Sequence, residues 1–400
     1  MNKPLNALLV GVGGYGTVYS DFLLSGEFDE DFRIAGVVDP YAKNSPCYEA
    51  LKAKAPIYDH MNDFFAKHKA DLTIIATPIH LHYEQCITAL ENDSHVLCEK
   101  PLVPTLDALN RLEKTAQDRN KILGVGFQWC HSDVMLALKQ RILSGEFGRP
   151  LRFKSYVSWP RDWAYFNRGV QWAGKIKTET GKLIHDSVAS NATAHYIQNM
   201  LFLLGNTMEE CAPLNNTQVE CYRANDIESF DTIVFRGKAG DLTGNSMPEV
   251  YYTASHATYY TIHPVMDYAF EKARIWVNVT DQDRVCTLHH ADGRVENLGL
   301  ALDDGEKNRL RYMAKRIRGQ QAHICTAHMA RPITALIDSV FKHVPFHNFP
   351  EAFVVRDQQS QSTYVKNLHL DLWDCFNQNN LPSEMGLAWS QKATSINCTL

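Results

Sequence analysis

The first third of the chain alternates short apolar runs with amphipathic segments. The apolar runs lie at 6–11, 33–39, 71–76, 95–99 and 122–127. Such short runs between turn residues are typical of buried strands. Amphipathic segments between them include 15–25, 81–91 and 105–119, and Thr105 is a candidate N-cap for the last. Buried strands that alternate with helices predict a parallel sheet covered on both faces.

The pattern changes after about residue 128. We expect one more helix at 133–144, and then strands in which apolar and polar residues alternate. These strands are expected at 151–159, 218–223, 230–236, 250–257, 273–279 and 285–290, with helices at 191–204 and 332–341. Because few crossover helices separate the strands, a large, mostly antiparallel open sheet is expected. The predicted fold class is an α/β Rossmann N-terminal domain, 1–128, followed by a C-terminal α+β domain, 129–400.

Composition excludes several classes of protein. There are 40 lysines and arginines against 45 acidic residues, so no basic surface for nucleic acid or a membrane is indicated. The ten cysteines include no CxxC pair, which favours a reducing compartment. The first apolar run is too short for a signal peptide, and no stretch approaches the roughly 18 apolar residues of a membrane span. We therefore expect a cytoplasmic protein.

A glycine-rich segment, GVGGYG at 11–16, follows the first predicted strand and opens the first predicted helix. In this context Gly11 permits a tight turn, Gly13 lets a pyrophosphate approach the backbone, and Gly16 lets the helix pack against the sheet. The helix N-terminus supplies N–H donors to the phosphates. Gly14 and Tyr15 complete the expected cofactor contacts of this segment. The alternative interpretation is a structural glycine turn without a ligand.

Asp39 ends the second predicted strand, 23 residues after Gly16. A carboxylate at this position hydrogen-bonds the adenosine ribose of a dinucleotide and repels a 2′-phosphate. The expected cofactor is therefore NAD, in preference to NADP.

Two further segments follow predicted strands, at the edge where open α/β sheets bind ligands. The expected cofactor contacts in and after them are Thr77, Pro78, His80, His82, Glu99, Lys100 and Gln128. A positively charged nicotinamide ring would favour the neutral amine of Lys100, which could then accept a proton from a substrate hydroxyl. The alternative is that Lys100 is a surface cation neutralised by Glu99.

These segments together resemble the glucose–fructose oxidoreductase/inositol dehydrogenase (Gfo/Idh/MocA) family. The resemblance rests on GVGGYG, on VVDP at 37–40, on ATP-x-x-x-H at 76–82, on EKP at 99–101 and on the segment 181–205. It implies NAD(P)-linked oxidation or reduction of sugars or polyols, with Lys100 as the acid/base lysine and His195 beside the reacting hydroxyl. It also implies that the C-terminal domain binds the substrate and that its open sheet often forms a subunit interface. A homo-oligomer, dimer or tetramer, is therefore expected.

The chain departs from the pattern of this family at several positions. Asn191 stands where an aspartate usually precedes the histidine by one turn; Asn191 and His195 are spaced to share a helix face. Asp186 is an alternative substrate carboxylate, set before that helix. Ile79 replaces a polar residue, and Trp172 is followed by alanine where Trp-Arg is common, although Trp172 remains an expected cofactor contact.

Four of the seven tryptophans fall between 129 and 172. Because aromatic faces pack on the C–H faces of sugar rings, Trp129, Trp159 and Trp163 are candidate substrate contacts. The alternative is that they fill a domain interface. Arg161 and Arg168, in the same stretch, could bind an anionic group of the substrate, or could be solvated loop charges.

Two histidine-containing patterns give weaker evidence for a functional site. His323, Cys325 and His328 resemble metal ligands but lack the four-ligand set of a structural zinc site, so no metal is expected. His256, on a predicted strand, is retained as a substrate contact, although a packed core histidine is the alternative.

The leading hypothesis is an NAD-dependent oxidoreductase that transfers a hydride between a carbohydrate and nicotinamide. The first alternative is an NAD-dependent glycoside hydrolase that oxidises a ring hydroxyl transiently and eliminates the aglycone. A second is a non-catalytic NAD-responsive regulator. A small carbohydrate is the expected partner, with no nucleic acid and no membrane.

Overall fold

The computed structural model describes residues 3–168, 172–240, 247–279, 284–302 and 304–398. The chain divides into two compact units. The first is Met1–His131 with Asp304–Ala330, and the second is Ser132–Asp303 with Arg331–Leu400. The expected division at residue 128 lies close to the first of these boundaries. The return of 304–330 to the first unit was not expected.

The first unit is built on a six-stranded parallel sheet in the order β3-β2-β1-β4-β5-β6. Its strands are β1 Leu5–Val10, β2 Phe32–Val38, β3 Ile57–Tyr58, β4 Leu72–Ile75, β5 His95–Cys98 and β6 Leu123–Val125. Its connecting helices are α1 Gly16–Leu24, α2 Tyr48–Lys54, α3 Met61–Phe65, α4 Ile79–Glu91 and α5 Leu106–Asp118. Thr105 caps α5 by accepting from the Ala108 amide, as predicted. This is the predicted Rossmann sheet, and the strand order reverses direction between β1 and β4.

The segment 304–330 completes the core of this unit. Helix α9 (Gly305–Ile317) contributes Leu310 and Met313 to the cluster that holds the β1 side chains. The Val125 amide donates to the Cys325 carbonyl at 2.7 Å, so the chain beyond α9 lies along the β6 edge. Gly124 allows close packing here, because a Cβ at this position would lie 3.1 Å from the Met313 sulfur.

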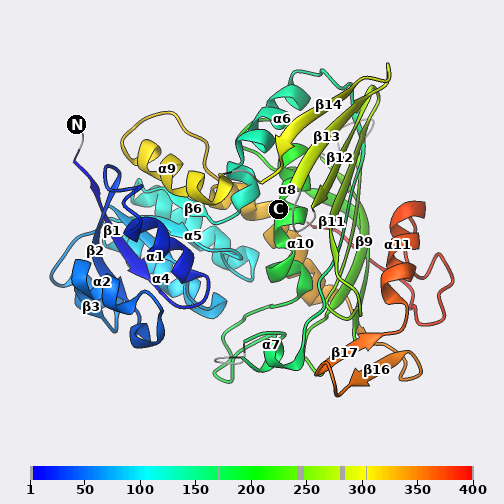
Figure 1. The fold of residues 1–400 in the computed structure, drawn as a ribbon, viewed down its shortest axis with the longest axis horizontal. Helices are drawn as coiled ribbons and strands as arrows, with labels where there is room; N and C mark the ends of the chain where they lie inside the picture. The colour runs from blue at the N-terminus through cyan, green and yellow to red at the C-terminus, as the bar shows by residue number, and fades with distance from the viewer. Residues whose placement is uncertain (1–2, 169–171, 241–246, 280–283, 303, 399–400) are drawn as a thin grey trace. The chain divides into compact units, whose positions relative to one another are not determined.

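The second unit contains a ten-stranded sheet in the order β14-β13-β12-β11-β7-β10-β9-β8-β15, with β18 also paired to β8 (Figure 1). Among its described strand pairs, only β7–β10 and β8–β15 are parallel, which confirms the predicted, mostly antiparallel sheet. The strands are β7 Pro150–Ser158, β8 Leu214–Arg223, β9 Thr232–Ala239, β10 Glu249–Ser255, β11 Ile262–Phe270, β12 Ala273–Val279, β13 Arg284–His290, β14 Val295–Leu300, β15 Phe346–Asn348 and β18 Thr394–Ile396. A separate hairpin joins β16 Val354–Asp357 to β17 Ser362–Val365.

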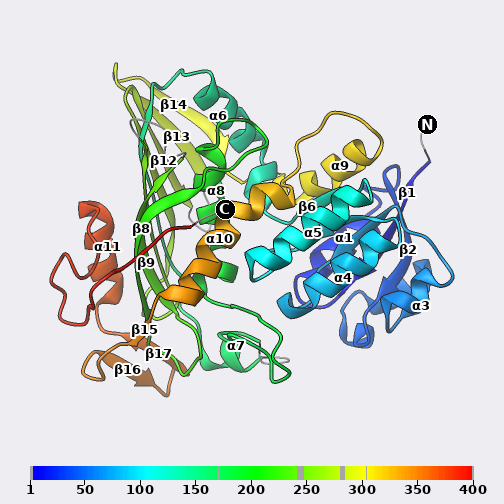
Figure 2. The same cartoon turned by 180° about the vertical axis from the view of Figure 1, so that it is seen from behind.

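Helices cover this sheet on both faces (Figures 1 and 2). On one face lie α6 (Asp133–Leu143), α8 (Ala194–Leu203) and α10 (Ala327–His343). On the opposite face lies α11 (Leu368–Gln378), which the sequence analysis did not predict. The chain after α11 is bonded to the same face, since Tyr251 donates to the Asn380 carbonyl and Arg236 pairs with Glu384. The C-terminal segment therefore covers part of this face of the sheet.

Candidate active site

The glycine turn after β1 has the geometry that its sequence predicts. Gly11 has a φ of +82°, and a Cβ there would lie 2.8 Å from the Ala76 carbonyl oxygen. A Cβ at Gly16 would overlap the Gly11 carbonyl oxygen. A Cβ at Gly13, in contrast, would have no heavy atom within 4 Å. Gly11 and Gly16 are therefore required by the fold, whereas Gly13 leaves space open beside the backbone.

Backbone donors face that space. Within the described chain, the amides of Gly13, Gly14 and Tyr15 donate to no acceptor, and all three residues are exposed. Successive N–H groups of this kind at a helix start form an anion-binding concavity. The turn fits a dinucleotide pyrophosphate.

Asp39 lies one residue beyond the end of β2 and holds this turn. Its Oδ2 accepts from the Val12 amide at 2.9 Å, and its Oδ1 accepts from the Tyr41 amide at 2.8 Å. The half-exposed carboxylate retains lone pairs, because two oxygens offer about four acceptor sites. Asp39 can therefore shape the turn and still accept ribose hydroxyls.

The segment after β4 is tied to the segment after β5 by His82. Its ring is 1% exposed, with Nε2 2.8 Å from the Thr77 carbonyl oxygen and Nδ1 2.9 Å from that of Pro101. Burial lowers the pKa of His82, so the neutral ring donates to one carbonyl at a time. His82 thus positions two loops and presents no ring nitrogen outward. Pro78 is the N-cap of α4, and the Thr77 hydroxyl donates to Gln85 Oε1 at 2.5 Å.

Lys100 lies two residues beyond β5 and is half-buried. Its amide donates to Oε2 of Glu99 at 3.1 Å. The carboxylate of Glu99 is buried, and its Oε1 accepts from the Tyr19 hydroxyl at 2.7 Å and from Arg309 Nη1 at 2.5 Å. The charge of Glu99 is therefore balanced by Arg309, inside the unit, and not by a surface lysine.

Arg309 is the residue of this site that the sequence analysis missed. It lies on α9, is fully buried, and also donates through Nη2 to the Tyr15 hydroxyl at 3.1 Å. The same hydroxyl lies 3.1 Å from Gln128 Oε1, so the glycine turn and the β6 end share one network. No motif marks Arg309. The available signal was that a buried glutamate needs a cationic partner, and this does not say which one.

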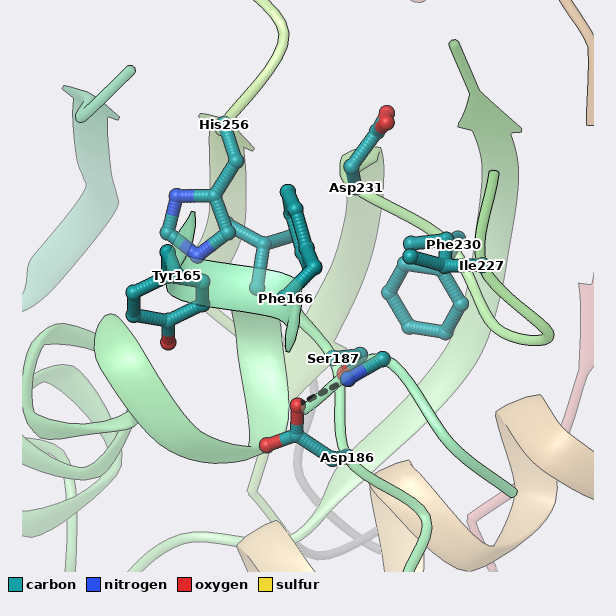
Figure 3. Close-up of a pocket in the computed structure, with 10 residues that line it drawn as sticks. Tyr165, Phe166, Asp186, Ser187, Ile227, Phe230, Asp231 and His256 are labelled. Carbon is teal, nitrogen blue, oxygen red and sulfur yellow. Dashed lines mark hydrogen bonds between the residues drawn. The ribbon is translucent and has the colours of Figure 1, made fainter. Parts of the chain in front are cut away.

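In the second unit, a small hollow is lined by Tyr165 and Phe166 of α7 (Trp163–Asn167) and by residues from four other segments (Figure 3). The other lining residues are Gly174, Asp186, Ser187, Val188, Ile227, Phe230, Asp231 and His256. Two of the predicted substrate contacts, Asp186 and His256, lie in its wall.

Asp186 is brought together with Asn191. Its Oδ2 accepts from the Gly174 amide at 2.6 Å (Figure 3). Its Oδ1 accepts from Asn191 Nδ2 at 3.0 Å. The two candidates for the family's missing aspartate are therefore hydrogen-bonded neighbours, and Asp186 is the buried carboxylate of the pair.

The expectation that Asn191 and His195 share one α-helical face is wrong. Residues Val188–Ala192 form a π-helical turn, and α8 begins only at Ala194, after Thr193 with a φ of −116°. The cause is local competition by side chains, because the Thr193 hydroxyl bonds the Val188 carbonyl and Ser187 caps the turn. His195 is half-buried in the first turn of α8.

His256 is held in one tautomer. Its Nδ1 lies 2.7 Å from the Trp159 carbonyl oxygen, which can only accept, so Nδ1 carries the proton. Burial, followed by the charge of Arg161, lowers the pKa of His256 to about 3. The ring is therefore neutral, and among the described residues nothing bonds to its Nε2, which is left as an acceptor.

The four tryptophans do not form one wall. Trp129 is a buried residue of the first unit, whereas the other three belong to the second. Trp163 donates its indole N–H to the Thr363 hydroxyl of β17 at 3.0 Å. Trp159 packs edge-on against Tyr196, with ring centroids 5.9 Å apart. The aromatic side chains of α7 that line the hollow are instead Tyr165 and Phe166, which the sequence analysis did not select.

Known proteins resemble this chain in sequence and in fold. A family model described as "Oxidoreductase family, NAD-binding Rossmann fold" matches residues 5–127, the first unit up to the end of β6. Residues 5–127 therefore match the same oxidoreductase family that the sequence motifs resemble. The matched segment contains the glycine turn, Asp39, Lys100 and residues that support them.

Curated relatives in this family include inositol 2-dehydrogenase of Rubrobacter xylanophilus, 26% identical over 211 residues, or 50% of this chain and 53% of the relative. The 2,7-anhydro-N-acetylneuraminate hydratase of Mediterraneibacter gnavus is 24% identical over 208 residues, 52% of this chain and 51% of the relative. The chain thus spans about half the length of these relatives.

Solved structures support the fold. The WlbA dehydrogenase of Bordetella pertussis, in complex with NADH and UDP-GlcNAcA, matches with a TM-score of 0.68 at 20% identity. The match covers 86% of this chain and 96% of that one, so both units have counterparts in a solved structure of the same fold.

Among the residues that the structure describes, no group of three or more His, Cys, Asp or Glu side chains is placed to hold a metal ion. In the same residues, no helix has both the length and the apolar character needed to cross a membrane.

Proposed function

We propose that this chain is a member of the Gfo/Idh/MocA family and an NAD-dependent oxidoreductase that transfers a hydride between a sugar, polyol or related carbohydrate and nicotinamide. The observation that carries the proposal is the combination, in one unit, of the three amides at 13–15 that lack an acceptor in the described chain, the Asp39 carboxylate beside them and Lys100 beyond β5. When bound, NAD supplies the hydride acceptor or donor.

The chain's own residues bind and orient that cofactor. The amides of Gly13, Gly14 and Tyr15 donate to the pyrophosphate, and Asp39 accepts from the adenosine ribose. The negative charge of Asp39 lies next to the ribose, so a 2′-phosphate is repelled and NAD is preferred to NADP. Thr77, Pro78, His80 and Gln128 are proposed to line the remainder of the cofactor site, and Trp172 is a further proposed contact. His82 and Glu99 act by positioning the two loops beneath it.

Lys100 is the proposed acid/base residue. In the oxidative direction its neutral amine takes the proton of the substrate hydroxyl as the carbon loses a hydride, and a carbonyl group forms. In the reductive direction the ammonium returns that proton to the carbonyl oxygen. His195 is proposed to hydrogen-bond the reacting hydroxyl. Asp186 and Asn191 are proposed to bind neighbouring hydroxyls, and Trp129, Trp159 and Trp163 to contribute apolar contacts.

The test is oxidation of a panel of sugars, inositols and glycosides with NAD⁺, followed by the absorbance of the NADH formed. Lys100→Ala should abolish turnover, because the proton acceptor is lost, whereas NAD binding measured by calorimetry should persist through the amides at 13–15 and Asp39. Lys114→Ala is the matched control, since that lysine is exposed on α5 and pairs with Asp118. Absence of both NAD binding and turnover in the unmodified protein would refute the proposal.

An NAD-dependent glycoside hydrolase is the second candidate. The hydratase among the relatives favours it, because hydration adds water where elimination has removed a group. Oxidation of one ring hydroxyl acidifies the neighbouring C–H, the aglycone leaves by elimination, water adds, and the hydride returns to the carbonyl carbon. Release of an aglycone without net NADH would favour this function, whereas one NADH for each free sugar consumed would favour the dehydrogenase.

We also propose a cytoplasmic location and a homo-oligomer that uses the C-terminal sheet. All ten cysteines are buried and none forms a disulfide, which suits a reducing compartment. The C-terminal segment covers the β7–β10 part of the outer face, so subunit contact is assigned to the outer face of β11–β14, where Trp276 is half-buried. Trp276→Asp should lower the mass measured by light scattering, and an unchanged mass would exclude this interface.

A further inference from the structure

We propose that the second unit binds an oxyanionic group of the substrate, a carboxylate or a phosphate, through Arg161 and Arg168. The natural substrate would then be an acidic carbohydrate. This inference rests on the proposed function and specifies the substrate class of the same enzyme.

The two arginines flank one aromatic ring of the hollow. The guanidinium carbon of Arg161 lies 4.7 Å from the ring centroid of Tyr165, and that of Arg168 lies 3.9 Å from it. Tyr165 lines the hollow together with His256 and Asp186 (Figure 3). Arg168 also lies over the Trp172 ring at 5.0 Å. Two positive charges, that of half-buried Arg161 and that of exposed Arg168, therefore lie beside Tyr165 in the wall of this hollow.

Neither charge is paired with a carboxylate among the described residues. Other arginines of this unit bind carboxylates directly, such as Arg141 with Glu146 and Arg236 with Glu384. In the described part of the chain, Arg161 and Arg168 have no carboxylate oxygen within 4.0 Å, the limit for an ion pair. The Nε of Arg161 is buried and meets no acceptor there. A buried donor without a partner is rare in folded proteins and indicates a group that a ligand completes.

The nearby carboxylates are hydrogen-bonded to other groups. Asp162 caps α7 by accepting from the Tyr165 amide at 2.8 Å, and Asp186 accepts from Gly174 and Asn191. The carboxylate of Asp231 accepts from the Ala224 and Asn225 amides and points away from Tyr165 (Figure 3). These carboxylates keep their charge when they accept hydrogen bonds, but in the described chain none of them forms an ion pair with Arg161 or Arg168.

Guanidinium chemistry selects the ligand class. A guanidinium group has five N–H donors, so an arginine beside an aromatic ring can still offer donors, and its planar edge matches the two oxygens of a carboxylate or phosphate. The neutral His256 offers its Nε2 as an acceptor on the same wall, which suits a hydroxyl next to the anionic group. A sugar acid or sugar phosphate presents this combination, and a neutral polyol lacks the anion.

The loop that carries Arg161 is held in place before any ligand binds. The Arg161 amide donates to the His256 carbonyl at 3.2 Å, and the Trp163 amide donates to the Gln361 carbonyl at 2.8 Å. Two separate segments therefore restrain the loop on either side of Asp162. This restraint lowers the ordering cost of binding.

The test compares matched ligands on the NAD-saturated full chain by titration calorimetry. Methyl glucuronide is paired with methyl glucoside, and glucose 6-phosphate with glucose, so the two arms separate carboxylate from phosphate. One charge-assisted contact corresponds to about tenfold to 100-fold in affinity, so one acid should bind at least about tenfold more tightly than its neutral partner. The Arg161→Gln and Arg168→Gln variants should bring that ratio toward one, and Arg161→Lys should restore part of it.

Arg294→Gln is the control, since Arg294 is exposed in the same unit and pairs with Asp292. Equal affinities within both pairs, no binding of either acid, or equal loss in Arg294→Gln would overturn the inference. Its failure is distinguishable from failure of the proposed function, because NAD binding and oxidation of neutral sugars would remain. Thermal unfolding of each variant confirms that the unit is folded.

Discussion

Arg309 of α9 forms a buried ion pair with Glu99, at 2.5 Å between Nη1 and Oε1, although 210 residues separate them in the chain. Glu99 in turn accepts from the amide of Lys100. Through this pair, a helix encoded near residue 310 supports the loop that carries the proposed acid/base lysine. Gly126 makes the arrangement possible, because a Cβ there would lie 2.6 Å from Glu99 Oε1.

Arg309→Met should therefore destabilise the first unit strongly. Removal of one partner leaves the Glu99 charge buried without compensation, which costs about 3–5 kcal/mol of unfolding free energy. Urea denaturation followed by circular dichroism measures this loss. The double variant Arg309→Met with Glu99→Gln should recover part of the stability, since the buried charge is gone.

Arg311→Met, on the same helix, is the control for that experiment. Arg311 is partly exposed and pairs with Glu27 at the surface, so its loss should cost no more than about 1 kcal/mol. Equal destabilisation by the two single variants would show that the loss of unfolding free energy comes from a general effect on helix α9 and not from the buried ion pair.

Gly13→Ala should weaken NAD binding, whereas Gly16→Ala should lower thermal stability. A methyl group at position 13 enters the open space before the proposed pyrophosphate, so the Kd for NAD should rise by about tenfold or more with little change in Tm. A Cβ at Gly16 overlaps the Gly11 carbonyl oxygen, so that variant should lower Tm even without NAD. Calorimetric NAD titration and thermal unfolding separate the two outcomes. Normal NAD affinity in Gly13→Ala would contradict the assigned phosphate site.

Asp39→Ala should narrow the gap between NAD and NADP affinities, by about tenfold or more, because one charge-assisted contact is lost and a 2′-phosphate is no longer repelled. NAD affinity should also fall, since the Val12 and Tyr41 amides lose their acceptor. Fluorescence titration with NADH and NADPH measures both effects. Equal affinities in the unmodified protein would show that Asp39 does not discriminate.

Stability of the first unit should decline in mild acid through His95. Burial, followed by the charge of Lys121, lowers the pKa of His95 to about 4, and its Nδ1 accepts from the Ile122 amide at 2.9 Å. The unfolded chain takes up this proton near pH 6.5, and the folded ring resists it until about pH 4. The neutral ring therefore favours folding above pH 6.5, and this contribution is lost as pH falls toward 4.

His95→Gln should accordingly show a smaller drop of Tm between pH 7 and pH 4.5 than the unmodified protein. The exposed His328 provides the control, and His328→Gln should leave the pH profile unchanged. A profile for His95→Gln that parallels the unmodified protein would assign the acid sensitivity to other groups.

The first unit and its cofactor turn could be predicted from local sequence alone. Continuous apolar runs mark strands buried on both faces, and the order of strand, glycine turn and helix leaves few topologies. The roles of Gly11, Gly13, Gly16 and Asp39 follow from backbone geometry within a few residues. These features are encoded by neighbours in the chain.

The remaining features depend on contacts between distant segments. Helix α9 carries apolar residues at helical spacing, but that spacing does not say which sheet they cover. Its place beside β6 follows from Leu310 and Met313 in the shared core and from the close approach of Met313 to Gly124. Trp163 appears in the sequence as a ligand contact, but the structure engages its N–H with Thr363, 200 residues away. Asn191 and His195 have helical spacing, yet Asn191 lies in a π-helical turn that the Thr193 side chain stabilises, and His195 lies in α8, which begins after it.

Local pattern therefore determines where the strands, helices and phosphate turn lie, because apolar periodicity and glycine conformations act over a few residues. Tertiary structure decides which charges are paired. The carboxylate of Glu99 is balanced by Arg309 from a distant helix, whereas Arg161 and Arg168 stack on Tyr165 with no carboxylate within ion-pair distance in the described chain. Pairing depends on the side chains that a folded core brings within a few ångströms, and spacing along the chain does not encode that proximity.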